Sequence, residues 1–170
     1  MDVVVRPIVG DEWRIWRELR MRATRDSPDS FRETVDDDLA RSDEWWEELL
    51  RTAAEHPRSI LLVADIEGRP VGILFSRVDA EFTYADVGAM WVDPEARGAG
   101  VGSALLDFAM VWALELGAPR MTLWVTDGNT GAEALYASRG FAPTGETGLL
   151  REGSSLTISE LGVDLSRAGH

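Results

Sequence analysis

The sequence predicts an α/β fold in which helices flank a mixed β-sheet. Segments with the two-residue alternation of strands are interspersed with segments that have the 3.6-residue period of helices. A Glu-Gly-Arg turn between two runs of Val, Ile and Leu is typical of a β-hairpin. An apolar strand leads through a glycine-rich turn into a long amphipathic helix. With 170 residues and 45% hydrophobic content, the chain can bury one substantial core, and we expect a single domain over residues 1–166.

The first half of the chain is expected to contain a short strand, two helical regions and then three strands. The first helical region carries Trp13, Trp16 and Leu19 at helical spacing. A cluster of turn-forming residues ends it, and a second helical pattern follows. After residue 58 the period becomes that of strands. The predicted elements are a strand at 3–7, helices at 11–24 and 34–55, and strands at 59–66, 71–79 and 84–92.

The second half begins with the long helix and then alternates between strands and a helix. Gly117 and Pro119 end the long helix. Residues 167–170 are expected to form a disordered tail. The predicted elements are a helix at 100–116, a strand at 121–126, a short helix that contains Tyr136, a strand after Phe141 and a last strand at 155–165.

The turn before the long helix has the composition of a phosphate-binding loop. Gly98, Gly100 and Gly102 lack a Cβ atom, so the backbone can take positive φ angles and its N–H groups can approach a bulky anion. The first N–H groups of the helix have no partner within it, and the helix dipole adds roughly half a positive charge there. Arg97 adds a full positive charge. This turn therefore suits a pyrophosphate group.

The spacing within this turn argues against two nucleotide-binding motifs. A Walker A loop needs a lysine after its last glycine, and a dinucleotide fingerprint needs GxGxxG, whereas the sequence from Gly98 is GAGVG. Arg97, Gly100 and Gly102 instead give RxxGxG after a strand that ends at Val92. This spacing resembles the acyl-CoA-binding motif of the GNAT superfamily of N-acetyltransferases. The resemblance implies acetyl-CoA as the co-substrate.

A second segment, residues 120–141, carries the same resemblance. GNAT proteins have a similar strand, then Asn, Ala and Tyr on a short helix, then a Gly-Phe pair that leads into the next strand. The residues that match in order are Asn129, Ala132, Tyr136, Gly140 and Phe141. The resemblance covers nearly the whole chain, least clearly before residue 58. It implies a GNAT-like mixed, mostly antiparallel twisted sheet flanked by helices.

Spacing places Asn129, Ala132 and Tyr136 on one face of the short helix. Each residue alone has an ordinary explanation, because asparagine is a good helix N-cap and tyrosine a common half-buried core residue. Taken together beside the glycine turn, they favour a face that meets a ligand.

Composition and charge exclude several other kinds of function. The chain has no cysteine, which excludes disulfides, thiolate metal sites and a cysteine nucleophile. With only His56 and His170, we expect no metal site. A net charge of −13 argues against a nucleic-acid partner. The amino terminus lacks the pattern of a signal peptide, and no apolar run approaches membrane-spanning length, so we expect a cytoplasmic protein without membrane contact.

The resemblance assigns cofactor contacts to three segments. A break in sheet pairing near the end of the 84–92 strand would turn backbone N–H groups toward the thioester carbonyl, where a donor is worth about 3 kcal/mol in the transition state. Tyr136 would lie near the thioester sulfur and protonate or hydrogen-bond the departing thiolate. The predicted cofactor-binding residues are Met90, Trp91, Val92, Arg97, Gly98, Ala99, Gly100, Val101, Gly102, Ser103, Asn129 and Tyr136.

An ammonium acceptor must lose a proton before it attacks, so we expect a carboxylate or a water chain near the amine. Asp86 is the first choice for this base, because strict alternation puts it on the same face of the strand as Met90 and Val92. Asp79 and Glu81 are the alternatives, although both fit exposed turn positions better.

The acceptor cleft is the least specified part. The resemblance assigns it to the early helices and their loop, and the predicted lining residues are Phe31, Tyr84 and Trp124, with Ser30, Trp45 and Trp46 as further candidates. The leading acceptor is a small molecule with a primary amine, such as an amino acid, a polyamine or an amino-sugar drug. A peptide or protein amine is the second choice, and a CoA-binding regulatory module without turnover is an alternative of another class. Edge strands and the resemblance are compatible with a homodimer.

Overall fold

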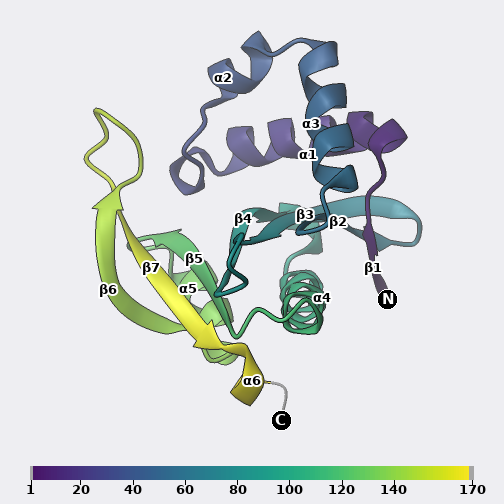
Figure 1. Cartoon of the computed structure of the whole chain (residues 1–170). Coiled ribbons are helices and arrows are strands. Elements are labelled where there is room, and N and C mark those ends of the chain that lie inside the picture. Colours follow the sequence, from purple (N-terminus) through teal and green to yellow (C-terminus); the bar gives the residue numbers. More distant parts are fainter. Residues whose placement is uncertain (1, 169–170) are drawn as a thin grey trace.

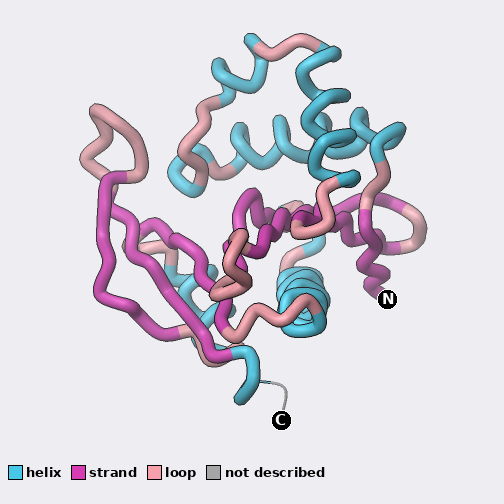
Figure 2. The backbone as a smooth tube through the Cα atoms, in the orientation of Figure 1, coloured by secondary structure: helices cyan, strands magenta, loops and turns pink. Residues whose placement is uncertain are grey.

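A seven-stranded sheet with helices on both faces forms the centre of the computed structural model, which describes residues 2–168 (Figures 1 and 2). The strands are β1 (Val3–Pro7), β2 (Ser59–Ile66), β3 (Arg69–Val78), β4 (Ala85–Val92), β5 (Arg120–Thr126), β6 (Ala142–Leu149) and β7 (Thr157–Asp164). The helices are α1 (Trp13–Asp26), α2 (Val35–Ala40), α3 (Asp43–Glu55), α4 (Val101–Glu115), α5 (Thr130–Ser138) and α6 (Leu165–Ala168). Single 3₁₀ turns lie at η1 (Gly10–Glu12), η2 (Pro28–Ser30) and η3 (Pro94–Ala96).

The sheet is mixed and mostly antiparallel, as predicted. Its strand order is β1-β2-β3-β4-β5-β7-β6, and only β4 and β5 run parallel. These two strands pair over Ala85–Val87 and Met121–Leu123 alone. Because β4 continues to Val92 and β5 to Thr126 without further pairing to each other, the sheet opens between them.

Two apolar clusters cover the two faces of the sheet. On one face α1 and α3 pack through buried side chains such as Trp16 and Leu50 (Figure 1). On the other face α4 and α5 contribute Leu105, Leu106 and Tyr136 to a larger cluster. The opening between β4 and β5 therefore lies between two well-packed layers. Among residues 2–168, no helix combines the length and the apolar composition that crossing a membrane requires.

The predicted helical region at 34–55 is wrong in one respect, because it consists of two helices. Thr34 caps α2 by accepting a hydrogen bond from Asp37 N, and Ser42 caps α3 by accepting one from Trp45 N. Arg41 between them has an extended backbone. These side-chain caps satisfy the free N–H groups of a new helix start, so the chain can turn there at little cost.

The end of the chain contains one short helix that the sequence pattern did not predict. In the proposed tail at 167–170, residues 167 and 168 are the last two of α6, and residues 169–170 lie outside the described residues.

Candidate active site

The turn between β4 and α4 presents a row of backbone donors. Gly98 and Gly100 have φ angles of 83° and 84°, and α4 begins at Val101. Within the described residues, no hydrogen-bond acceptor lies in range of the N–H groups from Gly98 to Ser103. A helix start with free donors and no side chain in the way is suited to bind an anion.

Gly102 differs from the other two glycines in its backbone conformation and surroundings. Its φ angle is not positive, and a Cβ atom there would lie 2.9 Å from Leu135 Cδ2 and 3.4 Å from Met90 Cε. By contrast, nothing lies within 4 Å of a Cβ built at Gly98 or Gly100. Gly102 therefore allows α4 to pack closely against α5 and β4, while the first two glycines open the turn.

A cavity of about 550 Å³ adjoins this turn. Every predicted cofactor residue except Ala99 lines it, and Ala99 faces a separate, smaller cavity. The predicted residues around the larger cavity are Met90, Trp91, Val92, Arg97, Gly98, Gly100, Val101, Gly102, Ser103, Asn129 and Tyr136. The fold thus brings Asn129 and Tyr136 beside the 90–103 segment, from which they are distant in sequence, around one space.

Arg97 is held by a partner that sequence reasoning missed. Its Nη2 atom donates to Asp26 Oδ2 at 2.7 Å, and its Nε atom donates to the Val92 carbonyl at 3.1 Å. Burial alone would raise the pKa of Asp26. The hydrogen bonds from Trp91, Ser27 and Arg97 together outweigh this effect, so the pKa of Asp26 lies below the ordinary 3.8. The charge of Arg97 is therefore partly compensated at the edge of the cavity. No local sequence signal links residues 26 and 97.

The predicted break in β4 is present, but it lies earlier than expected. Phe75 faces Gly88 and Ile73 faces Trp91 across the ladder, so β4 has an extra residue at Ala89–Met90. Ala89 has a φ angle of 51°, a conformation that non-glycine residues seldom adopt. Trp91 and Val92 are again in register with β3. This is a β-bulge, and bulges re-aim the side chains that follow them.

The bulge overturns the same-face argument for Asp86. Beyond it, Met90 and Val92 join the cluster on the α4 side of the sheet, whereas Asp86 lines a different cavity, together with Tyr84 and Glu160. Asp86 Oδ1 accepts a hydrogen bond from Thr122 Oγ1 at 3.0 Å. Burial raises the pKa of Asp86, more than the Thr122 bond lowers it. Neither cavity lined by Tyr136 includes Asp86.

The two alternative bases occupy a turn. Asp79 accepts hydrogen bonds from the backbone N–H groups of Thr83 and Tyr84 and from the Thr83 hydroxyl. These bonds outweigh desolvation and lower the pKa of Asp79 to about 2. Glu81 lies exposed in the same turn. Both carboxylates therefore have the structural surroundings of turn residues.

Tyr136 lies on α5 and is buried against β4. It is 8% exposed, its ring packs against Phe141 with centroids 5.9 Å apart, and its Oη atom lies 3.6 Å from Met90 Sδ. Burial raises its pKa to about 12. The phenol is therefore a neutral proton donor at ordinary pH.

Asn129 both caps α5 and faces the cavities. Its Oδ1 atom accepts from Ala132 N at 3.3 Å, so the ordinary N-cap role is real, and its Nδ2 atom donates to Ser30 Oγ at 3.4 Å. Asn129, Ala132 and Tyr136 line the same two cavities, which confirms that they share one face.

A second cavity of about 430 Å³ lies between α1, α3, the 30–33 segment and the open part of the sheet. Phe31 and Trp124, two of the residues predicted to line the acceptor cleft, both line this cavity, and Trp124 is 39% exposed. Tyr84 instead lines the cavity that contains Asp86 and Glu160. Both Trp45 and Trp46 belong to α3; Trp46 is buried in the core, and Trp45 packs edge-on against it outside these cavities. Trp13 and Trp46 thus belong to the core alone, whereas the buried Trp16 and Trp91 also line cavities.

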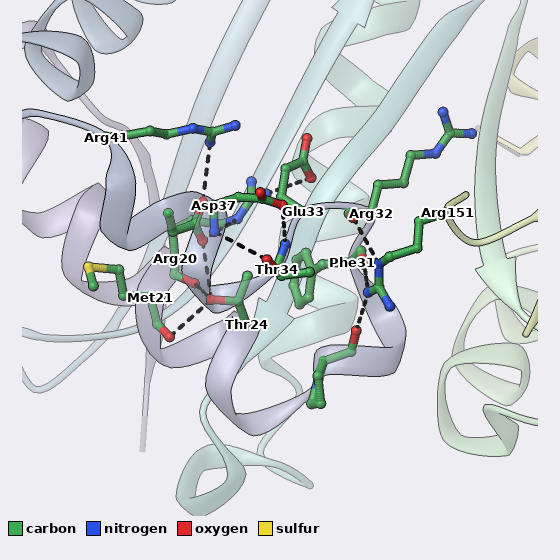
Figure 3. A network of polar contacts seen from close by, with 12 residues as sticks. Arg20, Met21, Thr24, Phe31, Arg32, Glu33, Thr34, Asp37, Arg41 and Arg151 are labelled. Atoms are coloured by element: carbon green, nitrogen blue, oxygen red, sulfur yellow. Dashed lines mark hydrogen bonds and ion pairs between the residues drawn. The ribbon is translucent and has the colours of Figure 1, made fainter. Parts of the chain in front are cut away.

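Hydrogen bonds from the loop between β6 and β7 hold the segment that forms one wall of this second cavity. Arg151, between β6 and β7, donates to the carbonyl oxygens of Pro28, Phe31 and Arg32 (Figure 3). Thr126 Oγ1 donates to the carbonyl of Asp29 at 2.6 Å. These bonds hold the turn after α1 against the carboxyl end of β5. Sequence reasoning missed Arg151, because such a contact depends on how distant loops meet.

Comparison with known proteins identifies the family of this fold and site. Residues 13–141 match the family model described as "Acetyltransferase (GNAT) family". The chain belongs to the GNAT family. Its relatives include mycothiol acetyltransferases from Salinispora tropica (31% identity; 81% of this chain and 43% of the relative) and Clavibacter sepedonicus (32%; 82% and 42%). This GNAT chain spans about two fifths of the length of those relatives.

Solved structures show the same GNAT fold. An acetyltransferase of the GNAT family from Streptococcus pneumoniae superposes with a TM-score of 0.77 at 23% identity, covering 96% of this chain and 99% of that one. Spermidine N-acetyltransferase from Vibrio cholerae, solved with CoA and spermine, gives 0.81 at 18% identity, covering 99% and 98%. At these identities the likeness establishes the fold and not the acceptor.

Proposed function

We propose that this chain is an acetyl-CoA-dependent N-acetyltransferase that acetylates a primary amine of a small molecule by direct attack on the thioester. The observation that carries the proposal is that two cavities meet. The cavity beside the free N–H groups and the cavity behind the turn after α1 share Ser30, Met90, Asn129, Ala132 and Tyr136. A phosphate-bearing donor and an acceptor could therefore approach each other from two sides, which is the arrangement that a two-substrate transfer requires.

The residues present fit a coenzyme A diphosphate. The N–H groups from Gly98 to Ser103 have no acceptor among the described residues, and the space above Gly98 and Gly100 is open. Charge-assisted hydrogen bonds from such donors to phosphate oxygens are among the stronger polar contacts. Arg97 lies at the same edge of the cavity and would turn part of its guanidinium from Asp26 to the phosphates.

Acetyl-CoA supplies an acetyl group that is activated as a thioester. In the transfer, the amine nitrogen forms a bond to the carbonyl carbon, the carbon–sulfur bond breaks, the sulfur gains a proton and the nitrogen loses one. Tyr136 would hold a proton on Oη for the sulfur, because its pKa of about 12 keeps the phenol neutral. The irregular backbone at Ala89–Met90 would provide N–H donors for the carbonyl oxygen as negative charge develops.

The proton of the acceptor ammonium would leave through water. We call the second cavity, of about 430 Å³, the acceptor cavity. Glu33 is the only carboxylate among the described residues that line it, and Glu33 accepts a hydrogen bond from Arg20 at 2.8 Å. Asp86 lies in the neighbouring cavity, so any role as base would need a water chain past Trp124, which lines both.

A thiol-release assay tests the proposal. The chain would be mixed with acetyl-CoA and a panel of small amines, peptides with free N-termini and lysine peptides, and free thiol would be followed with a thiol-reactive dye. We expect acceptor-dependent thiol release with a small amine. Release with peptides alone would assign a protein acceptor, and saturable CoA binding without release would assign a regulatory module. The cytoplasmic location and the homodimer stay predictions.

A further inference from the structure

The acceptor cavity has mostly apolar walls. Large side chains from α1, the turn after it, the sheet and α3 surround it, including Trp16, Phe31, Leu49, Phe75, Leu123 and Trp124. Its volume of about 430 Å³ is at the lower end of the range for small-molecule sites, which run from about 300 to 1,000 Å³. Such walls suit a compact apolar group and bury little of a long polar chain.

The charged groups in this cavity do not cancel. Arg20 is paired with Glu33 at 2.8 Å and lies 3.7 Å from the buried carboxylate of Asp38. Arg32 also lines the cavity, and no carboxylate within the described residues lies within salt-bridge distance of its guanidinium. Figure 3 shows this guanidinium extending away from the network that binds Arg20. Arg32 is exposed, so one positive group without a paired carboxylate stands on the solvent side of the cavity, although the chain as a whole carries a net charge of −13.

A second arginine fixes the backbone of Arg32. Arg151 Nε donates to the Arg32 carbonyl at 3.1 Å and Arg151 Nη2 donates to the Phe31 carbonyl at 2.6 Å (Figure 3). Arg151 also has no carboxylate within salt-bridge distance in the part of the chain that the structure describes. Side-chain hydrogen bonds thus fix the backbone of the segment that carries Arg32.

Resting on the proposed N-acetyltransferase function, we propose that the acceptor is a compact amine with an apolar body and a carboxylate, of the kind found in an apolar α-amino acid. Arg32 binds the carboxylate, the apolar walls take the side chain, and the amine points to the shared edge at Met90 and Tyr136. A planar guanidinium is the side chain best suited to a carboxylate, because it offers two parallel donors. An acceptor with a second positive charge would meet Arg32 unfavourably.

An acceptor series with matched substitutions tests this inference. Thiol release would be measured with leucine and phenylalanine, with the same two amino acids as amides, and with aliphatic diamines of similar length. The variants are Arg32→Gln, Arg32→Lys and, as control, Arg14→Gln, which changes an exposed arginine of α1 that lines neither cavity. Calorimetry with acetyl-CoA would run in parallel on every variant.

We expect kcat/KM to be about tenfold higher for the amino acids than for their amides, as one charge-assisted contact would give. Arg32→Gln removes this preference through KM, Arg32→Lys keeps part of it, and Arg14→Gln changes nothing, while acetyl-CoA affinity stays the same throughout. Equal or better use of the amides or the diamines overturns the inference and leaves the proposed function intact, and preferred diamines would point to the acidic cavity of Asp86 and Glu160. If acetyl-CoA binds but no member of the series is acetylated, this acceptor class is wrong. If acetyl-CoA does not bind, the proposed function fails first.

Discussion

Replacing Gly100 with alanine separates the phosphate-binding role of the turn from its role in stability. Gly100 has a φ angle of 84°, and an alanine in this left-handed region costs roughly 1 to 2 kcal/mol of folding free energy. No atom lies within 4 Å of the new Cβ, so no clash adds to this cost. The methyl group would instead occupy the space in which a phosphate oxygen approaches the N–H groups of the turn.

Loss of one hydrogen bond to a charged phosphate corresponds to about 1.5 to 3 kcal/mol, which lowers affinity for coenzyme A about 10- to 100-fold. Gly68→Ala is the matched control, because Gly68 has a φ angle of 75°, also has open space around its Cβ position and lies in the turn between β2 and β3. Denaturant unfolding and calorimetric titration of coenzyme A would be run on both variants. We expect similar losses of stability and a loss of affinity in Gly100→Ala alone. Equal affinities in the two variants would refute the reasoning.

Three further substitutions test individual roles. Tyr136→Phe should lower kcat by about 100-fold or more at unchanged acetyl-CoA affinity, since general acids contribute about 10²- to 10⁴-fold. The Tyr136 pKa of about 12 predicts that wild-type kcat keeps this contribution up to about pH 10. Unchanged turnover in the variant would remove Tyr136 from the mechanism. Asp86→Asn should change kcat/KM by less than about threefold at every pH, because its side chain lies outside both shared cavities, and a loss of about 100-fold would restore it as the base. Asp26→Asn should raise coenzyme A affinity a few-fold, by about 1 kcal/mol or less, because it frees Arg97 for phosphate, and an unchanged or weaker affinity contradicts that account. Because the pKa of Asp26 lies below 3.8 in the folded chain, its contribution to stability is present above that pH and is lost on acidification, and the variant should lose this dependence in unfolding titrations.

The parts that sequence predicted well depend on short-range patterns. The strand at 3–7, the strand at 59–66 and the glycine turn before α4 follow from periodicity and from residue types within a few positions. Asn129 and Tyr136 were placed on one face by helical spacing alone. Such signals hold because backbone geometry fixes which neighbours share a side.

The parts that sequence reasoning missed depend on tertiary structure or on one irregular residue. Asp86 was misplaced because an extra residue at Ala89–Met90 reverses the alternation of β4, and alanine gives no sign that it will take a positive φ angle. The contacts from Arg97 to Asp26 and from Arg151 to the turn after α1 join residues about 70 and 120 positions apart. Thr34 and Ser42 are residue types that favour helix N-caps, so a cap at Ser42 is a local signal that divides the helical region at 34–55 into two helices.

The central claim is that the backbone donors from Gly98 to Ser103 bind the diphosphate of coenzyme A. The most direct test is calorimetric titration of the wild-type chain with coenzyme A and, separately, with pantetheine, which has the thiol arm but neither the diphosphate nor the 3′-phosphoadenosine, and with 4′-phosphopantetheine, which restores one of the two phosphates. We predict saturable binding of coenzyme A, binding of pantetheine that is weaker by about 100-fold or more because the charge-assisted contacts are lost, and intermediate binding of 4′-phosphopantetheine. No heat with coenzyme A, or equal affinity for pantetheine and 4′-phosphopantetheine, would contradict the claim.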